Sequence, residues 1–148
     1  DARTAWGNGL IEISETFENE GIEMATSLAS DMIDNLYGFN FGKVLFKPTL
    51  SGGSQTFRTT KEGALSYFVG HNPAYPNDSG FGIKFWREIN SDTAATFIDD
   101  TVAMWMGWVT FIDRDGQVTK VDKSWGYKLD DVGNLRITLH HSSLPYEP

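Results

Sequence analysis

The sequence of 148 residues has no cysteine, only three histidines and no long hydrophobic run. Without cysteine it has no disulfide bond, no thiolate metal site and no cysteine nucleophile. The His-Glu-x-x-His motif of zinc hydrolases and the Gly-x-Ser-x-Gly motif of serine hydrolases are both absent. No apolar stretch approaches the roughly 20 residues that a membrane-spanning helix needs, so we predict no membrane partner.

Positive charge is also scarce, because 12 lysines and arginines stand against 20 acidic residues and leave a net charge of −8. Nucleic acids and anionic membrane surfaces do not attract a protein this acidic, which excludes both as main partners. A hydrophobic content of 40% at this length predicts one globular domain over residues 1–148. The chain begins at Asp1 without a methionine or a targeting segment, as expected of a mature form or of a domain excised from a longer chain, so the compartment stays open.

The first 36 residues carry the pattern of two helices. Apolar side chains recur every three or four positions from Trp6 to Phe17 and again from Ala25 to Leu36. Thr4 is the predicted cap of the first helix. The stretch Glu18–Gly21 predicts a break between the two helices, since glycine tolerates a left-handed backbone.

A short strand and a third helix follow. We predict a strand from Val44 to Thr49, and a helix that begins after Thr59 and ends at Gly70. Thr59 and Glu62 have the spacing of a capping box, which is typical of a helix start. The segment Asn72–Gly80 is rich in proline, asparagine and glycine, which predicts a loop long enough to cover a site.

After Gly80 the hydrophobic period changes to two, which predicts strands. The predicted strands run from Phe81 to Ile89, Ala94 to Ile98, Val102 to Ile112, Val118 to Leu129 and Leu135 to Ser142. Short turns at Asp113–Gly116 and Asp131–Asn134 make neighbouring strands antiparallel. Helices followed by a meander indicate the α+β class: a cystatin-like or ketosteroid-isomerase-like cone, whose curved antiparallel sheet wraps around the N-terminal helices and leaves a pocket between them.

The residues predict no metal centre and no cofactor. His140 and His141 are adjacent on a strand and therefore point to opposite faces of the sheet. The segment Asp113–Gly116 resembles the start of a calcium loop, but the twelfth position is Ser124, where such loops need a bidentate glutamate. We therefore interpret that segment as a hairpin turn.

The C-terminal run from Leu139 to Pro145 is unusually polar for the end of a strand. His140 and Ser142 are two residues apart and share one face of the strand. Side-by-side placement is poor geometry for a histidine base that activates a serine nucleophile. The run indicates either a wet, functional rim or a solvated strand end, and composition alone does not separate the two.

Six blocks of sequence together resemble the iota-class carbonic anhydrases of cyanobacteria, other bacteria and algae. The blocks lie in order along nearly the whole chain: Lys47–Ser51, Ala64–Phe68, Tyr75–Gly82, Ala103–Trp108, Lys123–Tyr127 and His140–Pro145. The resemblance implies a fold similar to the association domain of calmodulin-dependent kinase, homodimers of cone-shaped barrels, and catalysis without a metal. It also implies carbon dioxide and bicarbonate as ligands, and a bacterial cell or an algal plastid as the compartment.

The resemblance carries the family's catalytic hydroxyl groups onto Thr49, Tyr67 and Ser142. It implies reversible hydration of carbon dioxide, with these three groups holding water and then bicarbonate. Each hydroxyl both donates and accepts a hydrogen bond. We expect His140 or His141 to pass the released proton to solvent, because imidazole titrates near neutrality. Strand alternation favours His140, which shares a face with Ser142, and a bulge would reverse that choice.

Two other functions fit the same fold class. A ketosteroid-isomerase-like enzyme would use Asp99 or Asp100 as its base and Tyr67 as oxyanion donor. A non-catalytic assembly module would instead use an apolar face of the sheet for oligomerisation. The alternating apolar residues of that face are Val102, Met104, Met106, Trp108 and Ile112.

Overall fold

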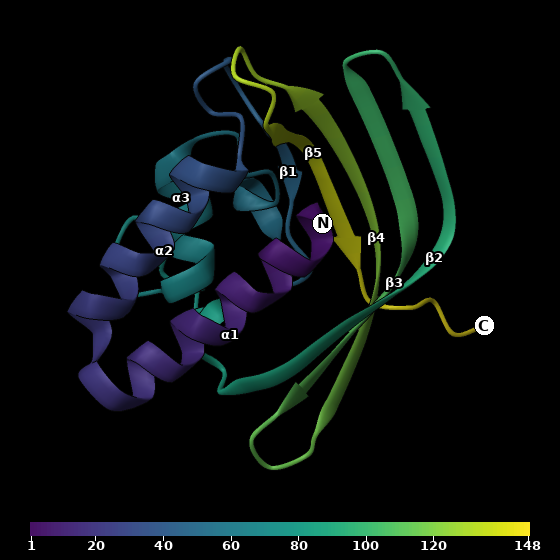
Figure 1. Cartoon of the computed structure of the whole chain (residues 1–148). Coiled ribbons are helices and arrows are strands. Elements are labelled where there is room, and N and C mark those ends of the chain that lie inside the picture. Colours follow the sequence, from purple (N-terminus) through teal and green to yellow (C-terminus); the bar gives the residue numbers. More distant parts are fainter.

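The computed structural model describes residues 1–148 and consists of three helices packed on one face of a curved five-stranded sheet. Figure 1 shows all the helices on one side of the sheet, while the other side is left uncovered. The strand order is β1-β5-β4-β3-β2. The predicted α+β class, with a curved sheet around N-terminal helices, is confirmed.

The two N-terminal helices form where the apolar stripes predicted them. Helix α1 spans Ala2–Glu20 and helix α2 spans Ile22–Leu36. The break falls at Gly21, whose φ of 90° lies in the left-handed region that favours glycine. The predicted cap at Thr4 is wrong, because the side chain of Asp1 accepts hydrogen bonds from the first backbone N–H groups instead.

Helix α3 spans Lys61–Val69 and begins one residue later than the capping box predicted. The cap is Thr60, whose hydroxyl oxygen accepts a hydrogen bond from the backbone N–H of Gly63 at 3.2 Å. The helix ends at Gly70, as predicted, with a φ of 64°. The following loop folds back so that Gly70 lies against the backbone of Ser79 and Gly80.

The sheet consists of β1 (Leu45–Lys47), β2 (Trp86–Asp99), β3 (Val102–Asp113), β4 (Val118–Leu129) and β5 (Leu135–Ser143). The prediction of separate strands over Phe81–Ile89 and Ala94–Ile98 is wrong. Phe81–Ile83 forms a 3₁₀ helix, and β2 is one long strand. An irregularity in its pairing with β3 between Thr93 and Ala95 interrupts the alternation of the sequence without ending the strand.

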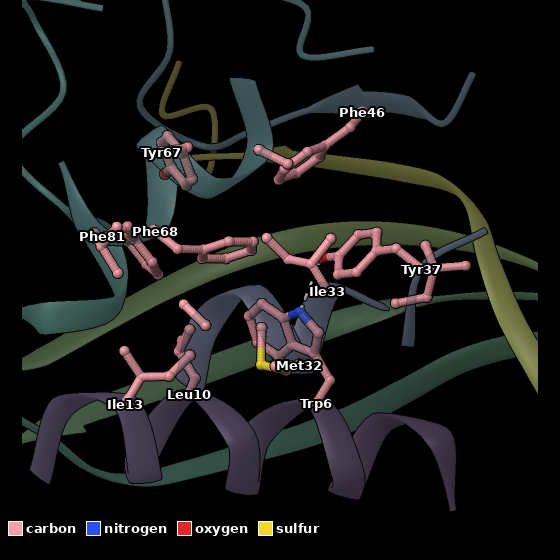
Figure 2. Packing of buried hydrophobic residues seen from close by; sticks show 14 of the residues in the cluster. Trp6, Leu10, Ile13, Met32, Ile33, Tyr37, Phe46, Tyr67, Phe68 and Phe81 are labelled. Carbon is pink, nitrogen blue, oxygen red and sulfur yellow. Dashed lines mark hydrogen bonds between the residues drawn. The ribbon is translucent and has the colours of Figure 1, made fainter. Parts of the chain in front are cut away.

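Strand β1 pairs in parallel with β5, with Phe46 beside His140 and Lys47 beside His141. This contact joins parts of the chain more than 90 residues apart. The core between sheet and helices is largely aromatic, and Figure 2 shows Trp6 of α1 among residues of α2, α3 and β1. The parallel contact places the residues that follow β1 beside the end of β5, at the edge of this aromatic core.

Candidate active site

Two of the predicted hydroxyl groups form a buried pair. Thr49 lies two residues beyond the end of β1, and Ser142 lies near the end of β5. Their oxygens Oγ1 and Oγ are 2.6 Å apart, and either can be the donor. Ser142 is fully buried and Thr49 nearly so. The parallel pairing of β1 with β5 is what brings these two residues together.

The third hydroxyl, that of Tyr67, comes to the same place from α3. It accepts a hydrogen bond from the backbone N–H of Leu50 at 3.1 Å, one residue after Thr49. Its ring stacks on Phe81 with centroids 5.7 Å apart (Figure 2). Burial raises the pKa of Tyr67, while hydrogen bonds from Leu50 and Thr49 oppose that shift in part. Tyr67 therefore stays a neutral hydroxyl, which donates and accepts hydrogen bonds.

A small cavity lies beside Tyr67. Its volume is about 20 Å³, which is enough for one water molecule. It is lined by Leu50, Tyr67, Lys84 and the residues from Asn77 to Phe81. The second half of the predicted loop Asn72–Gly80 therefore lies beside the Tyr67 hydroxyl.

A buried ion pair holds this loop in place. The two terminal nitrogens of the Arg58 guanidinium group donate to the carboxylate of Asp78 at 2.7 Å, and Ser66 of α3 donates to the same carboxylate at 2.7 Å. The guanidinium also lies over the ring of Tyr75, 4.5 Å from its centroid. The loop is thus tied to the helix that carries Tyr67 by charge-assisted hydrogen bonds.

His140 does not lie on a wet rim. Its ring is 1% exposed and stacks on Phe46 with centroids 4.6 Å apart. Both ring nitrogens have protein partners: Nδ1 is 2.8 Å from the Tyr37 hydroxyl and Nε2 is 2.9 Å from Lys123 Nζ. Burial holds the pKa of His140 well below 6.5. Direct contact of His140 with solvent is absent, and only His141 of the pair is exposed; a catalytic role for His140 stays a prediction.

Sequence reasoning missed the partners of His140, which are Lys123 and Tyr37. Lys123 is 3% exposed and lies directly across from Ser142 in the pairing of β4 with β5. A signal was present, since Lys123 stands two residues from both Val121 and Trp125 and therefore shares the inward face of β4 with them. Tyr37, just after α2, had no comparable signal, because only its bridge to Ile137 of β5 brings it to the site.

The structure does not support the alternative based on an acidic base. Asp99 and Asp100 are exposed at the turn between β2 and β3. A ketosteroid-isomerase-like base instead requires an apolar cavity. No group of three or more His, Asp or Glu side chains is arranged to hold a metal ion. None of the helices combines the length and the apolar character that a membrane-spanning segment requires.

Comparison with known proteins identifies relatives along nearly the whole chain. A family model for metal-independent carbonic anhydrase matches residues 1–144. A metal-independent carbonic anhydrase of Nostoc sp. is 50% identical over 146 residues, which span 99% of this chain and 71% of that protein. The crystal structure of an iota-carbonic anhydrase from a cyanobacterium, complexed with bicarbonate, is also 50% identical. It superposes with a TM-score of 0.98 over 99% of this chain and 90% of the other.

A more distant structure shares the fold alone. It is a calcium/calmodulin-dependent protein kinase II association domain from Xanthomonas campestris, 23% identical, with a TM-score of 0.54 over 81% of this chain and 76% of its own. The predicted likeness to that domain is therefore confirmed at the level of fold. The predicted resemblance to the iota class is confirmed by the two relatives of 50% identity. The chain belongs to the family of metal-independent carbonic anhydrases.

Proposed function

We propose that this protein catalyses the reversible hydration of carbon dioxide to bicarbonate at the hydroxyl groups of Thr49, Tyr67 and Ser142. The observation that carries the proposal is the 2.6 Å contact between Thr49 Oγ1 and Ser142 Oγ beside the tyrosine hydroxyl. Membership of the family and the likeness to a structure complexed with bicarbonate support the reaction class.

The surroundings suit both ligands. Carbon dioxide is nearly apolar, and the aromatic rings of Phe46, Phe81 and Tyr67 supply an apolar wall. Bicarbonate is a planar anion with three oxygens, and it needs donors. Each of the three hydroxyl groups can turn its proton toward a bicarbonate oxygen or toward a water lone pair. The same groups therefore hold the water first and the product afterwards.

The nucleophile in this proposal is a positioned neutral water. Bulk water has a pKa of about 15.7, and hydroxyl side chains do not lower it as zinc does. Positioning of the water against carbon dioxide supplies up to about 7–11 kcal/mol. Each donor aimed at the developing carboxylate adds about 3 kcal/mol. The water loses its proton along the hydroxyl network while the new C–O bond forms.

His140 has an indirect part in this proposal. Because both of its nitrogens are occupied inside the protein, it belongs to a buried relay with Lys123 and Tyr37. It shares its face of β5 with Ser142, so the relay lies next to the hydroxyl pair. We assign it the role of holding that relay in position.

Stopped-flow measurement of carbon dioxide hydration tests the proposal. We expect activity that survives a chelator, and losses of about 10²-fold or more in Tyr67→Phe, Thr49→Val and Ser142→Ala, since each removes one donor at the reacting centre. Ser143→Ala on the same strand is the matched control and keeps its rate. Hydration no faster than in buffer would reject the function, and unchanged rates in all three variants would reject the site.

We also infer that two copies of the chain associate through the uncovered face of the sheet. The groove on that face has a volume of about 570 Å³ and is lined mainly by hydrophobic side chains, among them Phe97, Met104, Met106 and Leu139. Met106 is 58% exposed in the single chain. Monomeric proteins rarely expose such patches, and a self-complementary sheet face suits a two-fold dimer.

A further inference from the structure

Lys123 is a buried lysine without a carboxylate partner. It forms no salt bridge, and its Nζ contacts His140 Nε2 at 2.9 Å. The rings of Trp6, Trp125 and Phe111 surround the nitrogen, with centroids 4.8, 5.5 and 5.8 Å away. Burial of an unpaired ammonium group is costly, so such a lysine tends to give up its proton.

The hydrogen bonds around His140 leave a place for one further proton on Lys123. Trp6 Nε1–H is a donor only, and it donates to the Tyr37 hydroxyl at 3.0 Å (Figure 2). The Tyr37 oxygen has a second lone pair, to which His140 Nδ1–H can donate at 2.8 Å. In this tautomer of a neutral His140, Nε2 accepts a hydrogen bond from an N–H of Lys123. The single lone pair of a neutral Lys123 amine then stays free to take up a proton.

We infer that Lys123 is a neutral amine in the resting enzyme and takes up the proton released when carbon dioxide is hydrated. This role rests on the proposed function. Lys123 and Ser142 are directly paired across β4 and β5 and are both buried on the same face. Cβ atoms of such pairs lie about 4.5–5.5 Å apart, so the Lys123 side chain starts next to that of Ser142.

The step balances without a metal. The water oxygen forms a bond to the carbon of carbon dioxide, and one O–H bond of that water breaks. Its proton passes through the Ser142 and Thr49 hydroxyl groups to the lone pair of Lys123 Nζ. Carbon dioxide, water and the amine thus become bicarbonate and an ammonium group. After bicarbonate has left, the ammonium proton returns through the Ser142 and Thr49 hydroxyl groups to a buffer base in the vacated site, which restores the starting state.

The relay accommodates both protonation states. Protonated Lys123 still donates to His140 Nε2, so the imidazole keeps its proton on Nδ1, facing the Tyr37 oxygen, in both states. The three aromatic faces favour the cation. Burial and the nearby charge of Lys47 oppose it, Asp122 favours it, and together they lower the pKa of Lys123 to about 7. Both states are therefore accessible at neutral pH, as a group that shuttles a proton in both directions requires.

Nitrogen NMR of the unmodified enzyme tests the resting state directly. We expect the Lys123 side-chain nitrogen to titrate as a single group between pH 6 and pH 8. An ammonium signal for Lys123 up to pH 9 would overturn the inference. This measurement needs no variant, so it stands even where a substitution impairs folding.

Variants of the lysine test its role in the reaction. We expect Lys123→Met, which keeps the length but has no base, and Lys123→Arg, which stays charged, to lose about 10²-fold or more in kcat/KM. The step near pH 7 in the pH profile disappears in both, while Lys120→Met keeps rate and profile. Retention of activity within about threefold in Lys123→Met overturns the assignment. If the unmodified enzyme does not hydrate carbon dioxide, the proposed function fails and the proton-uptake role fails with it, whatever the NMR titration shows.

Discussion

At the scale of single residues, the chemistry of the site depends on groups that are buried together and not on groups that are individually unusual. Thr49 and Ser142 are ordinary alcohols and Tyr67 is an ordinary phenol, and a serine or threonine in water is a weak acid and base. What distinguishes them is that Thr49 and Ser142 share a hydrogen bond away from solvent, beside a tyrosine hydroxyl that accepts one from the Leu50 backbone. In a medium of low dielectric such hydrogen bonds are stronger and more directional than in water.

The buried pair of Arg58 and Asp78 gives a prediction about stability. We expect Asp78→Asn to lower the free energy of unfolding by about 3–5 kcal/mol, because it leaves the guanidinium group, itself 3% exposed, without a counter-charge. Asp34→Asn is the matched control. Its ion pair with Lys61 is largely exposed, so the cost is below about 1 kcal/mol. Chemical denaturation measures both, and equal costs would contradict this account of the loop.

Lys123 also makes stability depend on pH. Its pKa is about 7 in the folded chain and near the ordinary 10.5 in the unfolded chain, so between these values the unfolded state binds more protons. The free energy of unfolding therefore rises with pH through this window, by up to about 1.4 kcal/mol per pH unit for this one group. We expect the difference between wild type and Lys123→Met to show this slope in denaturation series from pH 7 to pH 10. A pH-independent difference would contradict a shifted lysine.

At the scale of elements, the helices were the most predictable part of the fold. Their apolar stripes and the glycines at their ends are local signals. Helix α1 ends at Gly21 and helix α2 near Tyr37, as expected. The caps were less predictable. Asp1, Thr4, Thr59 and Thr60 are all good capping residue types, and the choice among them depends on backbone geometry, which the pattern does not contain.

The long strand β2 shows where local patterns fail. Its alternation is interrupted near Thr93, and the sequence therefore predicts two strands, yet the hydrogen bonds to β3 continue past the irregularity. A bulge of this kind is defined by the partner strand, because two residues of one strand face one residue of the other. A single sequence does not show which residues of the partner strand lie opposite the bulge.

Gly107 of β3 lies at this irregularity and gives a prediction at the same scale. A Cβ there would overlap the carbonyl oxygen of Asp92 in β2 and lie 2.8 Å from the Trp105 ring. We expect Gly107→Ala to cost about 1–3 kcal/mol in the free energy of unfolding, through displacement of β2. Gly52→Ala, at a site with open space around it, costs less than about 0.5 kcal/mol. Thermal unfolding compares the two, and equal melting temperatures would show that the strands part without strain.

At the scale of the whole molecule, helices on only one side of the sheet leave a large apolar face uncovered (Figure 1). We expect Met106→Asp to convert a dimer into a monomer, since it places a charge in the middle of the proposed contact. Val132→Asp, at an exposed position in the turn between β4 and β5, leaves the dimer intact. Light scattering with size-exclusion chromatography measures both masses, and a monomeric wild type would reject the dimer.

Taken by itself, the sequence determined the class of the fold, the residue types of the candidate site and membership of the iota class. These are properties of local period and of ordered motifs, and both can be detected without knowing which segments touch. The catalytic roles of Thr49, Tyr67, Ser142 and His140, and the single domain over residues 1–148, stay predictions. The alternation of side chains along β5 correctly predicted that His140 and Ser142 lie on one face of the sheet.

Which groups meet, and which of them are buried, depends on how the whole chain folds. The parallel contact of β1 with β5 brings Thr49 to Ser142 across more than 90 residues of chain. The sequence of neither segment predicts that the two will pair. The helices then cover the inward face of β4 and β5, which turns Lys123 and His140 from apparently solvated residues into a buried relay. Strand period is a property of neighbours in sequence, whereas burial and hydrogen-bond partners depend on contacts between distant segments.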